Sequence, residues 1–387
     1  MDPVDIFGIA LIIIVSTLAI TGFGIIVGLI YKGIDRKLSA HMQGRIGPPI
    51  RQPFRDVVKL FTKENIVPEN SIPWIFNMAP FIGLISTISI LLFIPIGGLD
   101  PVLGGLLTDS SGSPLIYGDL VLILYLLLIP SLAMVIGGFA SGSPYATVGA
   151  QREMATMMAY EFPLAIIIVS FAWAINRNII NLNLTITEPA NHISQNAFSI
   201  TELNNIPTSV TAQGVITGTS TIWGIIGPLG LIGLLILLFV LILITPAELS
   251  KIPFDSPEAE TEIAGGLLAE YSGRNLGLFY LTDAVKTIVM ASIVVMLFFP
   301  FNLSPTLGLE SGSYAAYAAD IIFYLVKILL VVIFSVTVIR VAIARLKIDQ
   351  IVYTYWFWLT LAALFGLVFI IIDRSMDLQS LVEIMGL

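Results

Sequence analysis

The chain has 387 residues, of which 57% are hydrophobic and only 11% are charged, and its net charge is -8. Its mean hydropathy of +0.96 and its low charge content exclude an ordinary soluble domain, which carries about 25% charged residues. The absence of cysteine excludes disulfides and thiolate-ligated metal or iron–sulfur centres in this chain.

This composition predicts an all-α, polytopic membrane protein in which residues 1–387 form one transmembrane domain. A helix needs about 20 apolar residues to cross a bilayer. We expect an amphipathic interfacial helix after the first span and eight spans in total, at residues 6–31, 75–97, 115–138, 153–175, 220–246, 276–300, 317–342 and 351–373.

The positive charges predict the orientation of these spans. Most of the 18 Lys and Arg residues lie in the loops that follow the first, third, fifth and seventh spans. Because cytoplasmic loops are enriched in Lys and Arg, these loops are predicted to be cytoplasmic and both termini to lie outside the cell membrane. The cytoplasmic loops cover about 32–74, 139–152, 247–275 and 343–350, and a long outer segment covers about 176–219.

Residues 53–63 in the first cytoplasmic loop have the spacing of an amphipathic helix. Its apolar face carries Phe54, Val57, Val58 and Phe61, and its polar face carries Arg55, Asp56, Lys59 and Lys63. A helix of this kind lies in the membrane interface. Two roles are open: attachment to anionic lipid, and docking of a soluble partner through Arg51, Arg55 and Lys59.

The loop 247–275 concentrates negative charge. Its six carboxylates are Glu248, Asp255, Glu258, Glu260, Glu262 and Glu270. They are interleaved with apolar residues such as Phe254, Ile263 and Leu267. A solvated acidic loop is one interpretation, but this mixture favours a packed or re-entrant segment in which neighbouring carboxylates raise one another's pKa and share protons.

Charge within a membrane span is costly and indicates function, and four ionisable residues within the predicted spans or at their ends are the candidates here. Glu153 and Glu161 lie about two turns apart in the fourth span, where Pro163 is expected to loosen the helix. Asp283 and Lys286 are three residues apart in the sixth span and can meet on one face.

Together with the acidic loop, these residues form a string of carboxylates from the cytoplasmic surface toward mid-membrane, as a proton relay requires. The competing interpretations are purely structural. Asp283 and Lys286 would then form a neutralised ion pair that only sets packing, and Glu161 would be a protonated, hydrogen-bonded carboxyl group.

Several short motifs on the predicted cytoplasmic side occur together in one order. They are Gly44-Arg45-Ile46-Gly47-Pro48-Pro49, Gln52-Pro53, Gly149-Ala150-Gln151-Arg152-Glu153, Tyr160-Glu161, Pro253-Phe254-Asp255, Glu258-Ala259-Glu260-Thr261-Glu262 and Glu270-Tyr271-Ser272-Gly273. Over nearly its whole length the chain resembles the membrane subunit that anchors the redox module of respiratory complex I, the NADH dehydrogenase subunit 1 family. It also resembles the matching subunit of energy-converting, membrane-bound nickel–iron hydrogenases.

The resemblance implies a non-catalytic subunit that anchors a hydrophilic redox module and couples electron transfer to H⁺ or Na⁺ translocation. The motifs imply relay roles for Glu153, Glu161, Glu258, Glu260, Glu262 and Glu270, to which the span analysis adds Asp283 and Lys286. They also imply an interface or cavity wall at Asp35, Arg36, Arg45 and Arg152.

The same resemblance implies where the cofactors and partners lie. No cofactor is expected in this chain, whereas iron–sulfur clusters and a nickel–iron site are implied in partner subunits. These partners would be a hydrogenase-like large subunit and an iron–sulfur small subunit on the cytoplasmic side. Antiporter-like membrane subunits and membrane lipid complete the expected partners, and nucleic acid is not among them.

Two alternatives to a hydrogenase-type subunit stay open at this stage. The first is a quinone- or methanophenazine-site subunit of a complex I-like dehydrogenase. Against it, only two residues separate Pro48-Pro49 from Gln52-Pro53, and this short spacing resembles that of the hydrogenase branch of the family. The second, from another class, is a stand-alone secondary ion transporter. The sequence shows no inverted repeat, which many transporters have.

The predicted orientation is tested by single cysteines, because the native chain has none. A cysteine at Thr185 should react with a membrane-impermeant thiol reagent added from outside, whereas a cysteine at Thr62 should react only after the membrane is opened. The reverse pattern of labelling would contradict the orientation.

Overall fold

The computed structural model describes residues 3–96, 119–183, 198, 203, 206–210, 216–309 and 313–376. Within these residues, eight helices are long and apolar enough to cross a membrane, which confirms the predicted all-α polytopic fold. The α-helices are α1 (Pro3–Met42), α2 (Gln52–Thr62), α3 (Pro73–Phe93), α5 (Leu120–Ala140), α6 (Pro144–Asn183), α7 (Ile222–Ile225), α8 (Pro228–Glu248), α9 (Glu260–Ile263), α10 (Gly273–Phe298), α11 (Tyr314–Val332), α12 (Val338–Ala342), α13 (Ile348–Tyr353) and α14 (Thr360–Met376).

Shorter elements join these helices. Two π-helical turns, η3 (Ile333–Thr337) and η4 (Thr354–Leu359), connect α11 to α12 and α13 to α14. Two 3₁₀ turns, η1 (Ser256–Glu258) and η2 (Gly266–Leu268), lie in the acidic loop. The strands β1 (Ile206–Val210) and β2 (Ile216–Ser220) form an antiparallel pair that the sequence analysis did not predict.

The helices cover parts of the predicted loops. Because α1 continues to Met42 and α6 begins at Pro144 and ends at Asn183, the predicted segments 32–74, 139–152 and 176–219 are partly helical. Much of the segment 176–219 lies outside the described residues.

Pro163, which was expected to loosen the fourth span, does not interrupt it. The helix α6 continues through Pro163 without a break. In a membrane bundle, neighbouring groups satisfy the backbone carbonyl that a proline leaves free. Pro163 is buried, and α8 and α14 pack against α6.

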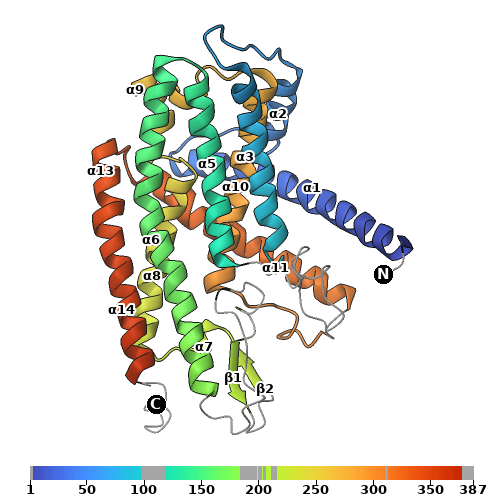
Figure 1. Ribbon diagram of the computed structural model, residues 1–387, viewed down its shortest axis with the longest axis vertical. Coiled ribbons are helices and arrows are strands. Elements are labelled where there is room, and N and C mark those ends of the chain that lie inside the picture. Colours follow the sequence, from blue (N-terminus) through green and yellow to red (C-terminus); the bar gives the residue numbers. More distant parts are fainter. Residues whose placement is uncertain are drawn as a thin grey trace.

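The long helices form a bundle with two distinct ends (Figure 1). Helices α3, α5, α6, α8 and α14 follow the long axis, whereas α1 leaves the bundle sideways. Helices α2 and α9 lie at one end, named here the α2/α9 end, and α7 with the two strands lies at the opposite, hairpin end.

Helix α10 occupies the centre of the bundle. In its most apolar 18-residue stretch, 94% of the residues are buried, compared with 28% in α1. It packs against α1, α2, α3, α8 and α11, and Val285, Ile288 and Val289 belong to the main hydrophobic core. Polar side chains on α10 are therefore buried inside the protein, namely those of Thr282, Lys286 and Ser292.

Helix α2 confirms the predicted amphipathic helix, and it rests on protein along one face. Phe54 and Val57 pack with Leu29 of α1 and Leu281 of α10. The other two apolar residues that were predicted for this face, Val58 and Phe61, are exposed. The helix is therefore fixed to the bundle and still presents apolar surface outward.

A close approach between α1 and α10 depends on Gly28. A Cβ atom at this position would lie 2.6 Å from the carbonyl oxygen of Ala284, which is a backbone atom of α10. About one turn further along α1, the Tyr31 hydroxyl donates to the carbonyl of Leu325 in α11 at 2.8 Å, a second contact between α1 and the bundle.

We expect Gly28→Val to lower the stability of the chain in detergent by about 1–3 kcal/mol, the usual cost of overpacking. Gly22→Val on the same helix is the matched control, because no atom lies within 4 Å of a Cβ there. The measurement is the midpoint of thermal denaturation. Equal midpoints for the two variants would contradict the close approach.

Candidate functional site: a charged cavity at the α2/α9 end

The acidic loop is folded back into the bundle. It contains η1, α9 and η2, and the side chains of Phe254, Ile263, Leu267 and Tyr271 are buried. Burial raises the pKa of the Tyr271 hydroxyl above its usual range. The prediction of a packed segment is confirmed, and the alternative of a solvated acidic loop is wrong.

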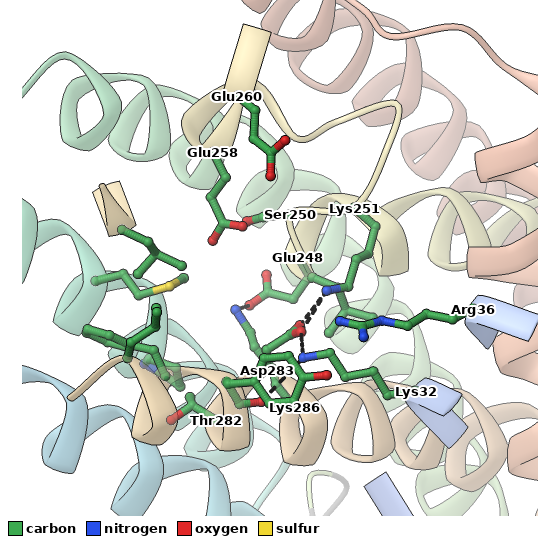
Figure 2. Close-up of a pocket in the computed structure, with 17 residues that line it drawn as sticks. Lys32, Arg36, Glu248, Ser250, Lys251, Glu258, Glu260, Thr282, Asp283 and Lys286 are labelled. Atoms are coloured by element: carbon green, nitrogen blue, oxygen red, sulfur yellow. Dashed lines mark hydrogen bonds and ion pairs between the residues drawn. The ribbon is translucent and has the colours of Figure 1, made fainter. Parts of the chain in front are cut away.

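Two cavities adjoin beneath this loop. The first has a volume of about 350 Å³ and reaches α5, α8 and α10, and the second has about 420 Å³ and reaches α1, α12 and Arg345. Both are lined by Lys32, Arg36, Ser250, Lys251, Glu258 and Glu260. Figure 2 shows the first cavity, with charged side chains from α1, the acidic loop and α10 directed into it.

Asp283 is held by two lysines from different parts of the chain. Its carboxylate lies 2.6 Å from the Lys32 ammonium and 2.7 Å from the Lys251 ammonium, and Figure 2 shows both contacts. The Lys32 ammonium also lies 3.3 Å from the centre of the Tyr280 ring, a cation–π contact. Asp283 therefore links α1, the acidic loop and α10.

Lys286 pairs with Glu248 at 2.7 Å, and both side chains are almost fully buried. Its ammonium also donates to the Ser131 hydroxyl at 2.8 Å. The interpretation that Asp283 and Lys286 neutralise each other is therefore wrong, because each pairs with residues of other elements.

Glu248 belongs to the predicted acidic loop but was not among the predicted relay residues. It ends the long apolar run of α8, and a carboxylate at a span end resembles an ordinary interfacial charge. The one available signal was the buried cation Lys286 in the next span, which needs a counter-ion.

Glu153 and Glu161 lie near Glu248 on the side of α6. Glu153 is 1% exposed, and one of its oxygens accepts a long hydrogen bond of 3.5 Å from Ser250. Among the described residues, its other oxygen and one oxygen of Glu161 are buried without a hydrogen-bond partner. Glu248 interacts electrostatically with both residues.

Glu258 and Glu260 line both cavities near the loop surface (Figure 2). Burial raises the pKa of Glu258 from 4.5 to about 6, although Lys251 opposes the shift. Glu260 is exposed. The two carboxylates therefore differ in solvation at the entrance to the cavities.

Two other predicted relay residues are separate from the cavities. The exposed carboxylate of Glu262 pairs with Arg152 at 2.6 Å, and Arg152 also donates to the carbonyl of Ser256. Glu270 is partly buried. Among the described residues, neither Glu262 nor Glu270 lines either cavity.

The predicted interface residues other than Arg152 divide into two groups. Asp35 lines the second cavity, where it accepts from Thr337 at 2.7 Å and from Arg340 at 3.2 Å. Arg36 lines both cavities and pairs with Asp56 at 3.0 Å. The remaining residues are exposed at or near α2, and they are Arg45, Arg51, Arg55 and Lys59.

The structure also reveals a strong ion pair that the sequence analysis did not predict. Arg345, in the loop before α13, binds both carboxylate oxygens of Asp255 and the hydroxyl of Thr261. In the described part of the chain, no group of three or more His, Cys, Asp or Glu side chains is placed to hold a metal ion.

Comparisons with known proteins agree with this arrangement. A family model described as NADH dehydrogenase matches residues 14–371. The chain is 30% identical to the H subunit of the NADH-quinone oxidoreductase of Syntrophotalea carbinolica, over 83% of this chain and 84% of that protein. The chain belongs to this family.

Other members of the NADH dehydrogenase family come from different complexes. The chain is 28% identical to hydrogenase-4 component C of Escherichia coli, over 87% of this chain and 89% of that protein. It is also 28% identical to the H subunit of the F(420)H(2) dehydrogenase of Methanosarcina mazei, over 86% of each.

A solved structure of a membrane-bound sulfane sulfur reductase, described as an archaeal respiratory membrane complex, contains a similar chain. The TM-score is 0.69 at 27% identity, with 92% of this chain and 99% of that chain covered. The family resemblance inferred from the motifs is thus confirmed. The chain is a multi-pass membrane subunit of the kind found in complex I-like oxidoreductase complexes.

The raised pKa of Glu258 predicts a pH-dependent stability. Below pH 4.5 the carboxyl group is protonated in both the folded and the unfolded chain, so its burial carries no charge penalty. As the pH rises to about 6, the unfolded chain loses this proton first and the folded state loses stability.

Glu258→Gln removes this titration. Its stability relative to the natural chain should therefore rise from pH 4.5 to about 6 and then level off, with a total gain of at most about 2 kcal/mol. Denaturation midpoints of both chains in detergent, measured from about pH 4 to about pH 8, test the prediction. A constant difference across this range would contradict it.

Proposed function

We propose that the chain anchors the hydrophilic redox module of an energy-converting, hydrogenase-type complex and couples electron transfer to translocation of H⁺ or Na⁺. The observation that carries the proposal is the pair of adjoining cavities, lined by Glu258 and Glu260 near the loop surface and by Glu248 and Lys286 inside the bundle.

The buried carboxylates supply the steps of the relay. Glu248 has Lys286 as its counter-ion, whereas Glu153 and Glu161 each have a buried oxygen that is free to bind a proton or a bridging water. A carboxyl group in such surroundings gains and loses a proton as nearby charges change. Glu262 and Glu270 would exchange protons at the surface of the acidic loop. Asp283 would influence the charge inside the cavities, because it pairs with Lys32 and Lys251.

The α2/α9 end supplies the docking surface. Arg45, Arg51, Arg55 and Lys59 are exposed there, next to the exposed Ile46. A surface of cations mixed with apolar residues suits a soluble protein partner. We place this end on the cytoplasmic side of the cell membrane, with both termini outside.

The partners that fit this surface are a hydrogenase-like large subunit and an iron–sulfur small subunit, which would carry the nickel–iron site and the clusters. Antiporter-like subunits would lie beside the chain in the membrane. The likeness to hydrogenase-4 component C supports this branch, and family membership argues against a stand-alone ion transporter.

A quinone- or methanophenazine-site subunit is the second candidate, since one relative belongs by name to an NADH-quinone oxidoreductase. The charged groups Lys32, Lys251 and Asp283 favour ion transfer. The first cavity also has apolar walls that include Met134, Leu268 and Phe279, so its lining is compatible with this candidate. This second candidate would be favoured if quinone analogues inhibit the complex and if the purified complex contains no nickel and neither produces nor oxidises hydrogen.

Glu161→Gln tests the relay. Glutamine has nearly the same shape and can form hydrogen bonds, but it cannot titrate. The variant complex should assemble and keep its dye-linked redox activity, and it should lose most ion uptake into inverted vesicles, as expected for a proton-transfer group worth about 10²–10⁴-fold.

Glu161→Asp is the matched control, because it keeps a titratable carboxyl group and should retain more ion uptake than Glu161→Gln. Assembly is checked by the subunits that copurify. Ion uptake at the natural level in Glu161→Gln vesicles would remove this residue from the relay and return it to a structural role.

A further inference from the structure

A groove on the surface of the bundle lies where α13 and η4 pass α6. Its volume is about 450 Å³, within the range of about 300–1,000 Å³ typical of small-molecule sites. Among the residues that the structure describes, none lines both this groove and one of the two charged cavities. Its walls are Ala155 of α6 together with Ile348, Asp349, Val352, Tyr353, Trp356 and Phe357.

The groove is polar at one end and apolar beyond it. Where α13 begins, the exposed residues Lys347 and Asp349 carry opposite charges two positions apart. Beyond the groove, a strip of exposed apolar side chains continues along α14, formed by Leu361, Leu364, Phe365 and Val368. This order of charge and apolar surface matches an amphiphile with a zwitterionic headgroup.

The aromatic residues of the groove indicate its depth in the membrane. Trp and Tyr are enriched at the boundary between lipid and water, and Tyr353 and Trp356, which line the groove, are both more than half exposed. Phe162 of α6 packs edge-to-face on Trp356 at 5.9 Å, which holds that ring in place. The groove therefore lies at the depth of lipid headgroups.

The same side chains argue against a neighbouring helix in the groove. Helices that pack closely in membranes present small residues such as Gly, Ala and Ser, whereas Tyr353, Trp356 and Phe357 would hold another backbone away. A quinone, which carries no charge, would leave Lys347 and Asp349 without a role.

We propose that this groove binds one phospholipid whose headgroup carries both a phosphate and an amine. Lys347 binds the phosphate and Asp349 binds the ammonium group. An acyl chain lies between Ala155 and the rings of Trp356 and Phe357, and it follows the exposed strip of α14.

The test uses the purified complex in mild detergent after removal of bound lipid. It is titrated with phosphatidylethanolamine whose acyl chains are brominated, and quenching of tryptophan fluorescence reports binding near Trp356. We expect saturable quenching that unlabelled phosphatidylethanolamine competes away and that phosphatidylglycerol, which has no amine, competes away less effectively.

Ala155→Phe fills the groove and should weaken lipid binding at least about fivefold, equivalent to about 1 kcal/mol. Val169→Phe is the matched control, since Val169 is exposed on the same helix but does not line the groove. Lys347→Gln changes an exposed residue and should weaken binding without affecting the fold.

Three results would overturn the proposal. The first is unchanged lipid binding in both Ala155→Phe and Lys347→Gln. The second is equal competition by phosphatidylglycerol. The third is loss of a membrane subunit from the Ala155→Phe complex with lipid binding intact, which would assign the groove to a partner helix.

Discussion

The ion pair between Glu248 and Lys286 fixes the geometry of the charged region. Both side chains lie almost fully buried, 2.7 Å apart, where an unpaired charge would cost several kcal/mol. The pair holds the end of α8 against the middle of α10. Because α8 ends at Glu248 and the rest of the acidic loop follows directly, the same contact determines where that loop enters the bundle and therefore where the cavities form.

A second set of ion pairs holds the acidic loop in position. Asp283 binds Lys251 of the loop and Lys32 of α1, and Asp255 binds Arg345 before α13. The loop is thus tied to elements at both ends of the chain. A change in protonation at Glu258, which lies among these pairs, would alter the balance of charge that holds the loop in place.

The fold was largely predictable from the sequence, because long apolar runs require helices that satisfy their own backbone groups in lipid. The amphipathic α2 also followed from spacing, as Phe54 and Val57 show. The strands β1 and β2 did not, because they are short and mix polar with apolar residues without a regular alternation. Helix α6 runs on through Pro163, since neighbouring groups in a membrane bundle can satisfy the carbonyl that a proline leaves free.

The candidate site was predictable in its residue types but not in its pairings. Ionisable residues within apolar runs pointed correctly to Glu153 and Lys286 as buried groups, and to Glu161 as a partly buried one. The pairing of the charges depends on long-range packing, which the sequence does not show. Spacing alone therefore suggested a pair between Asp283 and Lys286, which are three residues apart on one helix. The actual counter-ion of Lys286, Glu248, lies on a different helix, and no local rule of spacing leads to it.

The burial of α10 has a consequence for how the protein is made. A span that carries Asp283 and Lys286 is a poor substrate for insertion into lipid by itself, since each charge near the centre of a helix costs about 2.5–3.5 kcal/mol on insertion scales. Its counter-ions lie on α1, on α8 and just after α8, all of which precede α10 in the chain. The ribosome therefore delivers the neutralising partners first, and α10 can leave the translocon directly into a protein environment.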